Sequence, residues 1–512
     1  MSRYICTPCS LRLFCSQLHP RPGVTTTTSY SICGPTRPLS IGASHLLSPP
    51  PPSGQLNLSS TGTRSLICIH GPDATRFLQG VTTVNAEHLS SAAVSGSSSD
   101  STARASYAAF LTAQGRILHE GFLYNVNASK VWRERVGQWR SAPGAGTGGA
   151  REKWTVDDPA WFIEVAGESC RDLIRHLSRY KLRSKITLSE VASSRGRGVD
   201  GNSEEGVEGK WDVWVHWGNS NTTTSLSTGD TIYPTVDPTT LHVQDKRAPG
   251  LFTRYIVPYG LVSGGTPPLP PTLAPIVGVE HYHLRRYLQG VAEGPREIPS
   301  GKALPHEWNM DISGGGIDFH KGCYVGQEMT IRTEHRGVVR KRVVCLQLGP
   351  TEAPAQRYPP SLTYNPIYQG PAPPVGVEAV VIGDGGHHHH HHTPGQSEAS
   401  DHSGAAAINT GERRRKEAGR WLGGVGNIGL ALCRLESVFP SPPATGNETS
   451  EGSGRWGSEG FRLEWAEGGN TQCTGSEDGA AGSAQDSKTG VPVRAWMPGW
   501  HSAKQEETDG GK

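Results

Sequence analysis

The sequence predicts an α+β chain of several domains, and three observations lead to this prediction. A length of 512 residues allows about three domains of ordinary size. Strand-like runs alternate with helical patterns in the first two thirds of the chain, whereas only strand-like runs follow in the last third. The 65 glycines and 38 prolines are more than usual and the hydrophobic fraction of 35% is low, so linkers and insertions should be long.

The charge balance and the lack of long apolar runs exclude two classes of protein. The 49 lysines and arginines oppose 47 acids, a net charge of +2 that is too small for a protein-wide field toward nucleic acid or anionic membranes. No stretch approaches the roughly 20 apolar residues of a membrane helix. We therefore expect a soluble protein with no membrane span and no nucleic-acid partner; peripheral attachment to a membrane stays open.

The first 72 residues differ from the rest in charge. They contain five arginines and no lysine or acid, and the first carboxylate is Asp73. This Arg-bearing, Ser/Thr-rich and acid-free composition is typical of a mitochondrial transit peptide. The alternative is a Pro-rich disordered tail. We assign residues 1–60 to a transit peptide and linker, which indicates a mitochondrial protein.

Residues 61–342 are expected to form the main folded body. Residues 211–217 illustrate the evidence, because Trp211, Val213, Val215 and Trp217 recur at every second position as in a half-buried strand. A Ser/Ala-rich segment at 90–106 and a polar segment at 193–209 are expected insertions. The predicted elements are, in order, strand 65–70, a helix from 74, hairpin strands 107–111 and 116–126, strand 161–165, helix 169–182, strand 211–217 and helix 279–288.

Residues 343–470 are expected to form a small β-rich C-terminal domain, followed by a tail at 471–512. Strand-like runs lie at 343–348, 377–382 and 427–435. The insertion at 385–418 contains six histidines, His387 to His392. These can bind divalent metal in solution, but their Gly/Pro/Ser-rich surroundings offer no rigid frame, so no specific metal site is expected there.

Ten cysteines are spread over the chain, and four of them lie in the predicted transit peptide and linker. The other six form neither a C-x-x-C pair nor a zinc-finger spacing. A reduced compartment is therefore the simpler interpretation. The six are also too scattered to indicate four ligands of one stable iron–sulfur cluster, so transient or shared ligation is the most that they support.

The segment Phe319-His-Lys-Gly-Cys-Tyr-Val-Gly-Gln-Glu328 concentrates the reactive side chains. We expect a helix to begin near Cys323. A thiol at a helix N-terminus beside Lys321 would have a lowered pKa, which makes Cys323 a candidate nucleophile or soft metal ligand, with Lys321 assisting it. The alternative is a buried cysteine that packs as a small hydrophobic residue. Gln327 and Glu328 either bind backbone or ligand or cap the helix.

Lys321-Gly-Cys-Tyr-Val-Gly-Gln-Glu328, continuing to Arg336-Gly-Val-Val-Arg-Lys-Arg342, resembles the signature of the YgfZ-type, folate-binding relatives of the glycine-cleavage T-protein (the GcvT family). Gly71-Pro-Asp73, Leu182-Arg-Ser184 and Asn309-Met-Asp311 match the same family in order. The resemblance covers roughly residues 63–348. It implies a multi-domain, aminomethyltransferase-like α+β fold around a central cavity that can admit a tetrahydrofolate, with a C-terminal β-barrel.

The resemblance, together with a transit peptide, implies the mitochondrial branch of this family. Its members act in the matrix, late in the maturation of [4Fe–4S] proteins such as aconitase and lipoate synthase. The implied partners are iron–sulfur carrier proteins of the A-type class and the client apoproteins. Cys323 would contact the cluster, and the residues around it would line the folate cavity: Gly322, Tyr324, Gly326, Gln327 and Glu328.

One departure from the T-protein concerns its reaction. The T-protein has a Gly-Gly-x-x-Asp-Asp pattern where this chain has Gly115-Arg-Ile-Leu-His-Glu120, which disfavours aminomethyl transfer. A pterin still needs a carboxylate to hold its amino group, and Glu120 or Glu307 could serve; a structural salt bridge is the alternative for both.

Three hypotheses therefore stand. The first is an iron–sulfur assembly factor with a functional Cys323 and a folate cavity. The second is a tetrahydrofolate-dependent one-carbon or aminomethyl transferase. The third is a folate-binding structural partner whose cysteine is inert packing.

Overall fold

The computed structural model of the chain describes residues 51–91, 105–127, 132, 155, 157–191, 211–218, 241–258, 274–312, 314, 316–349, 362–374, 377–383, 416–439, 455–456, 460–466 and 488–501. The chain divides into residues 1–40 and residues 41–512, and every described element belongs to the second unit. Nearly all of the predicted transit peptide, the histidine tract 387–392 and most of the predicted insertions lie outside the described residues.

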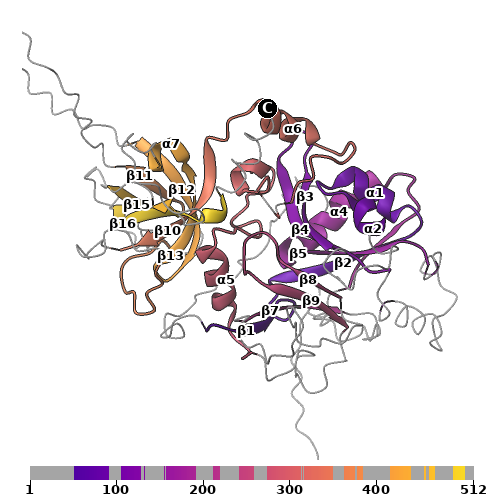
Figure 1. Cartoon of the computed structure of the whole chain (residues 1–512), viewed down its shortest axis with the longest axis horizontal. Coiled ribbons are helices and arrows are strands. Elements are labelled where there is room, and N and C mark those ends of the chain that lie inside the picture. The colour runs from indigo at the N-terminus through magenta and orange to yellow at the C-terminus, as the bar shows by residue number, and fades with distance from the viewer. Residues whose placement is uncertain are drawn as a thin grey trace, which may run out of the picture. The chain divides into compact units, whose positions relative to one another are not determined.

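A five-stranded antiparallel sheet with helices on one face forms the first part of the fold (Figure 1). Its order is β3-β4-β5-β2-β6. Ile67 and Ile69 pack with the helices, while Leu66 and Cys68 face the opposite side, as strand alternation requires. The elements are β2 (Arg64–His70), α1 (Ala74–Val81), α2 (Ala86–Ser91), β3 (Ala105–Leu111), β4 (Ile117–Asn125), β5 (Ala160–Ala166), η3 (Gly167–Ser169), α4 (Cys170–Lys181) and β6 (Thr187–Glu190).

A second antiparallel sheet, of order β1-β7-β9-β8, packs its apolar residues against that opposite side. Its strands are β1 (Gly54–Asn57), β7 (Trp211–Trp217), β8 (Leu241–Gln244) and β9 (Thr253–Pro258). The prediction of strand 211–217 is confirmed, but the strand is buried along almost its whole length and not half-buried, because Asp212 and Trp214 are covered as well. The prediction of a linker up to residue 60 is wrong for β1, because Leu56 is buried in the shared core and the strand pairs with β7.

Two helices follow on the way to the third sheet: α5 (Val279–Leu288) and, after the short 3₁₀ helix η7 (Pro305–Trp308), α6 (Gln327–Arg336). The prediction of helix 279–288 is confirmed. Helix α5 contacts β12 and β13 of the third sheet, and its Tyr282 and Leu284 belong to the core shared by the first two sheets. This helix therefore joins the two sheets to the C-terminal part.

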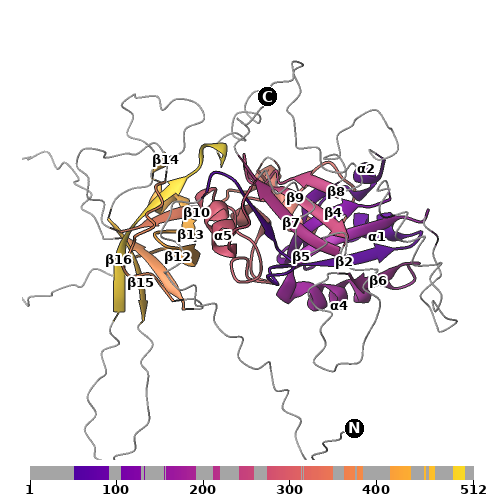
Figure 2. The same ribbon diagram turned by 90° about the horizontal axis from the view of Figure 1, so that it is seen from below.

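The third sheet closes into a barrel, which confirms the predicted C-terminal β-barrel. Six strands run in the order β10-β13-β12-β11-β15-β16, and β16 pairs back onto β10, so no strand of the ring has a free edge. The elements are β10 (Lys341–Leu348), β11 (Ala379–Gly383), β12 (Lys416–Val425), β13 (Ile428–Arg434), α7 (Leu435–Val438), β14 (Arg455–Trp456), β15 (Phe461–Ala466), β16 (Lys488–Met497) and η8 (Gly499–His501). Figure 2 shows β15 and β16 on the far side of this sheet from α5.

The predicted domain limits need correction at the end of the chain. Strand β16 lies within the segment 471–512 that was predicted to be a tail, and β12 begins within the predicted insertion 385–418. The tail prediction overlooked the alternation of apolar residues in β16, where Val491, Val493 and Ala495 point into the barrel core. No helix of the described residues is long and apolar enough to cross a membrane.

Candidate functional site

Cys323 lies in a loop that leads into α6 and is held against the first sheet. Of the five cysteines among the described residues, Cys323 is the exposed one, and the other four are buried. Burial raises the pKa of the Cys68 and Cys433 thiols to about 12. The described part of the chain therefore offers one accessible thiol.

Lys321 fastens this loop to the end of α1. Its Nζ donates to three backbone carbonyls, those of Gln79 (2.7 Å), Thr82 (2.7 Å) and Val84 (2.9 Å), which uses all three donors of an ammonium group. Burial lowers the pKa of Lys321 to about 8. Lys321 is thus a structural brace in this structure, directed toward α1.

Helix α6 begins at Gln327, four residues after Cys323, so the expectation of a helix starting near the thiol is wrong. The reason is Gly326, which precedes the helix with a left-handed φ of 81°. A Cβ on Gly326 would lie 2.2 Å from the Thr112 carbonyl oxygen, so only glycine lets the β3–β4 turn approach here. A Cβ on Gly115 would likewise lie 2.7 Å from Cβ of Met329.

The remaining predicted residues of this segment complete the loop. The Gln327 side chain accepts a hydrogen bond from the Tyr324 backbone N–H (3.1 Å), so it binds backbone in this structure. Tyr324 is buried, with its ring 4.8 Å from Lys321 Nζ, whereas Gly322 and Glu328 are exposed. The structure therefore brings these residues together as a rigid support for an exposed Cys323.

Glu120, on β4, belongs to a different site. It is 4% exposed; its Oε1 accepts from Arg64 Nη1 (2.9 Å) and from the backbone N–H of Gly294 (3.1 Å), while its Oε2 has no hydrogen-bond partner. The predicted structural salt bridge is present, and one buried carboxylate oxygen stays available.

Arg64 continues from Glu120 into a buried ion network that joins both sheets and α5. Its Nε donates to Glu164 Oε1 (2.9 Å), and Glu164 also pairs with Arg254 on β9. Glu293 accepts from Arg254 Nη2 (3.1 Å), Arg247 Nη2 (2.7 Å) and the Tyr282 hydroxyl (2.6 Å). Arg64, Arg247 and Arg254 therefore face four carboxylates, those of Glu120, Glu164, Asp245 and Glu293.

This network fixes charges inside the protein and was not predicted from the sequence. The arginines hold the pKa of Glu293 well below its usual range, although burial alone acts in the opposite direction. With three cations and four carboxylates, its formal charge is one negative. The signal that could have revealed it is a charge within an apolar strand, such as Glu164 in Ala160-Trp-Phe-Ile-Glu-Val-Ala166.

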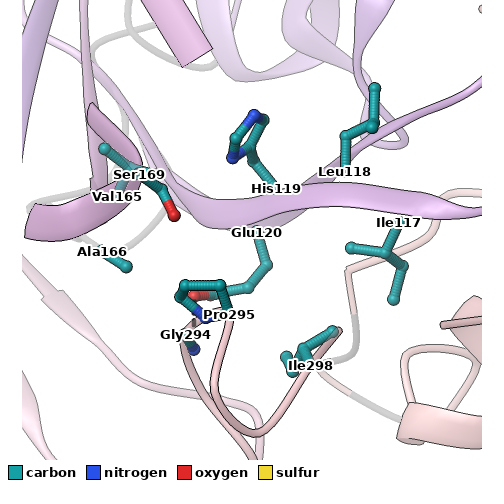
Figure 3. A pocket seen from close by; sticks show the side chains of 10 residues that line it. All are labelled: Ile117, Leu118, His119, Glu120, Val165, Ala166, Ser169, Gly294, Pro295 and Ile298. Atoms are coloured by element: carbon teal, nitrogen blue, oxygen red, sulfur yellow. Dashed lines mark hydrogen bonds between the residues drawn. The ribbon is translucent and has the colours of Figure 1, made fainter. Parts of the chain in front are cut away.

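A small pocket opens beside Glu120 (Figure 3). Ile117, Pro295 and Ile298 give it apolar walls, and the empty space of about 230 Å³ around them includes open solvent. The Glu120 side chain points toward Gly294 and Pro295, while the neighbouring His119 points to the other face of β4. The space that the pocket encloses is only about 10 Å³, room for roughly one water molecule, so its walls would have to move apart to admit a larger ligand.

Glu307 and a group of metal-binding side chains lie elsewhere. Glu307 is on η7 and does not line the Glu120 pocket; partial burial raises its pKa. Ligand atoms of His306, Asp311 and Glu334 lie within 4.8 Å of one another, but Arg342 donates to both oxygens of Asp311 at 2.8 Å. Within the described residues, no group of three such side chains includes Cys323.

Comparison with known proteins identifies relatives of this chain. No protein-family model matches it. It is 37% identical over 397 residues to the "Iron-sulfur cluster assembly factor IBA57 homolog, mitochondrial" of Chaetomium globosum, over 75% of this chain and 72% of that protein. The chain belongs to the IBA57 family. Its resemblance to YgfZ/GcvT-like proteins of the mitochondrial branch is thereby confirmed.

Two more IBA57 homologs extend the match over most of the chain. Those of Aspergillus clavatus and Coccidioides immitis are 32% identical over 470 and 453 residues, which is 89% and 88% of this chain and 83% and 84% of those proteins. Among solved structures, glycine cleavage system aminomethyltransferase T from Bartonella henselae aligns with a TM-score of 0.44 and 11% identity, over 88% of this chain and 86% of that one.

In this IBA57-family chain the predicted site residues form two separate sites. The Cys323 loop holds Lys321, Gly322, Tyr324, Gly326, Gln327 and Glu328. Glu120 lines the small pocket at the edge of the ion network, and Glu307 belongs to neither. The roles assigned to these residues remain predictions.

Proposed function

We propose that this protein is an iron–sulfur cluster assembly factor of the mitochondrial matrix, which acts late in the maturation of [4Fe–4S] proteins such as aconitase and lipoate synthase. The relatives named above are mitochondrial iron–sulfur cluster assembly factors. The single observation that carries a role for the thiol is the exposure of Cys323 on a loop that hydrogen bonds of Lys321 and Gln327 hold in place.

One accessible thiolate suits a shared cluster better than a resident one. Protein-bound clusters are usually held by four cysteines, and the other described cysteines are buried. In the proposed reaction, Cys323 supplies one ligand while a carrier protein of the A-type class supplies the others, and the cluster then passes to a client apoprotein. Cluster transfer favours such weak, incomplete ligation, because the protein that donates the cluster must release it.

Rigidity of the loop supports this role. Lys321 anchors one side of Cys323, and the contact of Gly326 with the β3–β4 turn anchors the other. A thiolate that is already positioned loses little conformational entropy when it binds a cluster. The buried alternative for Cys323, packing as a small hydrophobic residue, does not agree with its exposure.

A folate-type ligand is the second part of the proposal, with Glu120 as its acceptor. The unpartnered Oε2 of Glu120 is suited to accept from the amino group of a pterin ring, which would have to widen the small pocket beside it. The transferase alternative is less well supported, because Oε1 of Glu120 is already held by Arg64 and Gly294 and a second catalytic carboxylate is missing from the pocket lining.

Complementation of yeast cells that lack their own mitochondrial homologue tests the assembly role. Wild type should restore aconitase activity and protein lipoylation, and Cys323→Ser should restore neither. His320→Ser, on an exposed residue of the same loop, is the matched control and should behave as wild type. Equal rescue by Cys323→Ser would refute the thiol mechanism, while failure of an imported, folded wild type would refute the assembly role.

Calorimetry with tetrahydrofolate tests the ligand. Binding to the wild-type chain that is lost in Glu120→Gln, with a melting temperature lowered by no more than about 3 °C, would support the proposal. Binding that survives in Glu120→Gln would place the ligand elsewhere.

A further inference from the structure

The turn after α4 presents a leucine to solvent in a conformation that leucine disfavours. Leu182 is 86% exposed, with φ 43° and ψ −112°. The backbone N–H of Ser184 donates to the carbonyl of Lys181 at 2.8 Å, which closes a four-residue turn. These angles are close to those of the first central position of a type II′ turn, about +60° and −120°, which is usually glycine.

The fold does not need leucine at this position. A left-handed backbone conformation destabilises a non-glycine residue, and an exposed side chain returns little packing energy. The turn itself is well anchored, because the Lys185 backbone N–H donates to Asp73 Oδ2 at 2.7 Å and Ile186 is buried. A rigid turn that holds a strained, exposed leucine indicates that the side chain acts on something outside the chain.

Basic residues surround Leu182 and continue along α4. Residues 171–185 contain six lysines and arginines and one acid, in a chain whose net charge is only +2. Asp172 is paired with Arg175 at 2.8 Å. The other five have no ion pair with any residue that the structure describes, and they are Arg171, Arg179, Lys181, Arg183 and Lys185.

The cations form a stripe rather than a cluster. Arg171, Arg175 and Arg179 are four residues apart and all exposed, so they follow one face of α4, while Leu173 and Leu177 bury the opposite face. Figure 2 shows α4 along the outer side of β2 and β6. The stripe ends at Leu182, with Tyr180 (37% exposed) beside it.

We propose that this surface, α4 and the turn 181–185, docks on an anionic lipid bilayer, with Leu182 inserted among the lipids and the stripe of cations over the headgroups. Peripheral membrane binding requires just this combination of inserted apolar side chains and basic residues. Nucleic acid would attract the cations, but it would not explain the exposed leucine. An acidic protein would need a recess for Leu182 and an interface of about 1,000 Å².

Vesicle co-sedimentation of the full chain tests the proposal, with phosphatidylcholine vesicles and with phosphatidylcholine vesicles that contain cardiolipin. Wild type should sediment with the cardiolipin vesicles and lose this binding in high salt. Leu182→Gly should weaken binding at least about tenfold, because the inserted side chain is lost. Its melting temperature should stay equal or rise, because glycine relieves the strained turn.

Two further variants separate charge from insertion. Arg179→Glu combined with Arg183→Glu should weaken binding by a factor of about five or more for each cation removed. Ile367→Ser, on another exposed apolar residue in a loop before the second barrel strand, is the matched control and should bind as wild type.

Three results would overturn the proposal. Absence of any preference for cardiolipin vesicles is the first. Wild-type binding by both Leu182→Gly and the double variant is the second, since another segment, such as the arginines of residues 1–72, would then carry it. Loss of binding in the double variant but not in Leu182→Gly is the third, because it would indicate a general anion site of the kind that nucleic acid or an acidic protein occupies.

Discussion

Two carboxylates of the buried ion network should respond very differently to the same substitution. Glu164 is fully buried and holds three partners: Arg64 Nε (2.9 Å), Arg254 and the Tyr124 hydroxyl (2.6 Å). Glu120 holds one arginine and one backbone N–H through Oε1, and its Oε2 holds none. A glutamine keeps the shape of either side chain and removes its charge.

The expected magnitudes follow from these contacts. Glu164→Gln removes the fully buried ionic partner that Arg64 and Arg254 share, and breaking a buried ion pair costs about 3–5 kcal/mol of the unfolding free energy. That is a large share of the roughly 5–15 kcal/mol that a folded domain has. Glu120→Gln keeps both contacts through the amide oxygen, and Arg64 keeps Glu164, so about 1 kcal/mol should be lost.

Thermal and urea unfolding, followed by circular dichroism, measure the difference. Glu164→Gln should lower the melting temperature by roughly 10 °C and Glu120→Gln by about a third of that or less. Equal effects of the two substitutions would refute the reasoning, because they would show that the number of ionic partners does not decide the cost. A loss below about 1 kcal/mol in Glu164→Gln would do the same.

Three further predictions concern the Cys323 loop and α5. Gly326→Ala should destabilise the fold by at least about 2 kcal/mol, because its left-handed φ and close backbone contact exclude a Cβ, whereas Gly322→Ala, which has open space, should melt as wild type. Lys321→Met should lower the melting temperature by several degrees and abolish rescue in the complementation assay, since three carbonyls lose their donor; unchanged rescue would show that the brace is dispensable. Burial and the neighbouring Arg286 lower the pKa of His283 to about 4, so this side chain is neutral in the fold. Its contribution to stability is complete above about pH 6.5, and the free energy of unfolding falls by up to about 3 kcal/mol as the pH drops toward 4. His283→Asn should flatten that pH dependence in unfolding titrations, and an unchanged pH dependence would contradict the assignment.

Local patterns were enough to predict many of the elements. Strand 211–217 and helix 279–288 were predicted with their observed bounds, because alternation and helical spacing are properties of the segment itself. The barrel was predicted from three of its strands and from the family resemblance. Strand β1 and strand β16 were missed, because β1 has only four residues, β16 fell in the predicted tail, and each pairs with a strand far away in the sequence.

The sequence by itself determined the family and singled out the segment around Cys323, because Lys321-Gly-Cys-Tyr-Val-Gly-Gln-Glu328 is contiguous and specific. Only the tertiary structure decided what surrounds each residue. It placed α6 after the thiol, turned Lys321 toward α1 and separated Glu120 from Glu307. It also assembled the ion network, whose members come from β2, β4, β5, β9 and the segments beside them. Charges so far apart in the chain meet only when the sheets pack, and their mutual neutralisation is the reason that they can be buried at all.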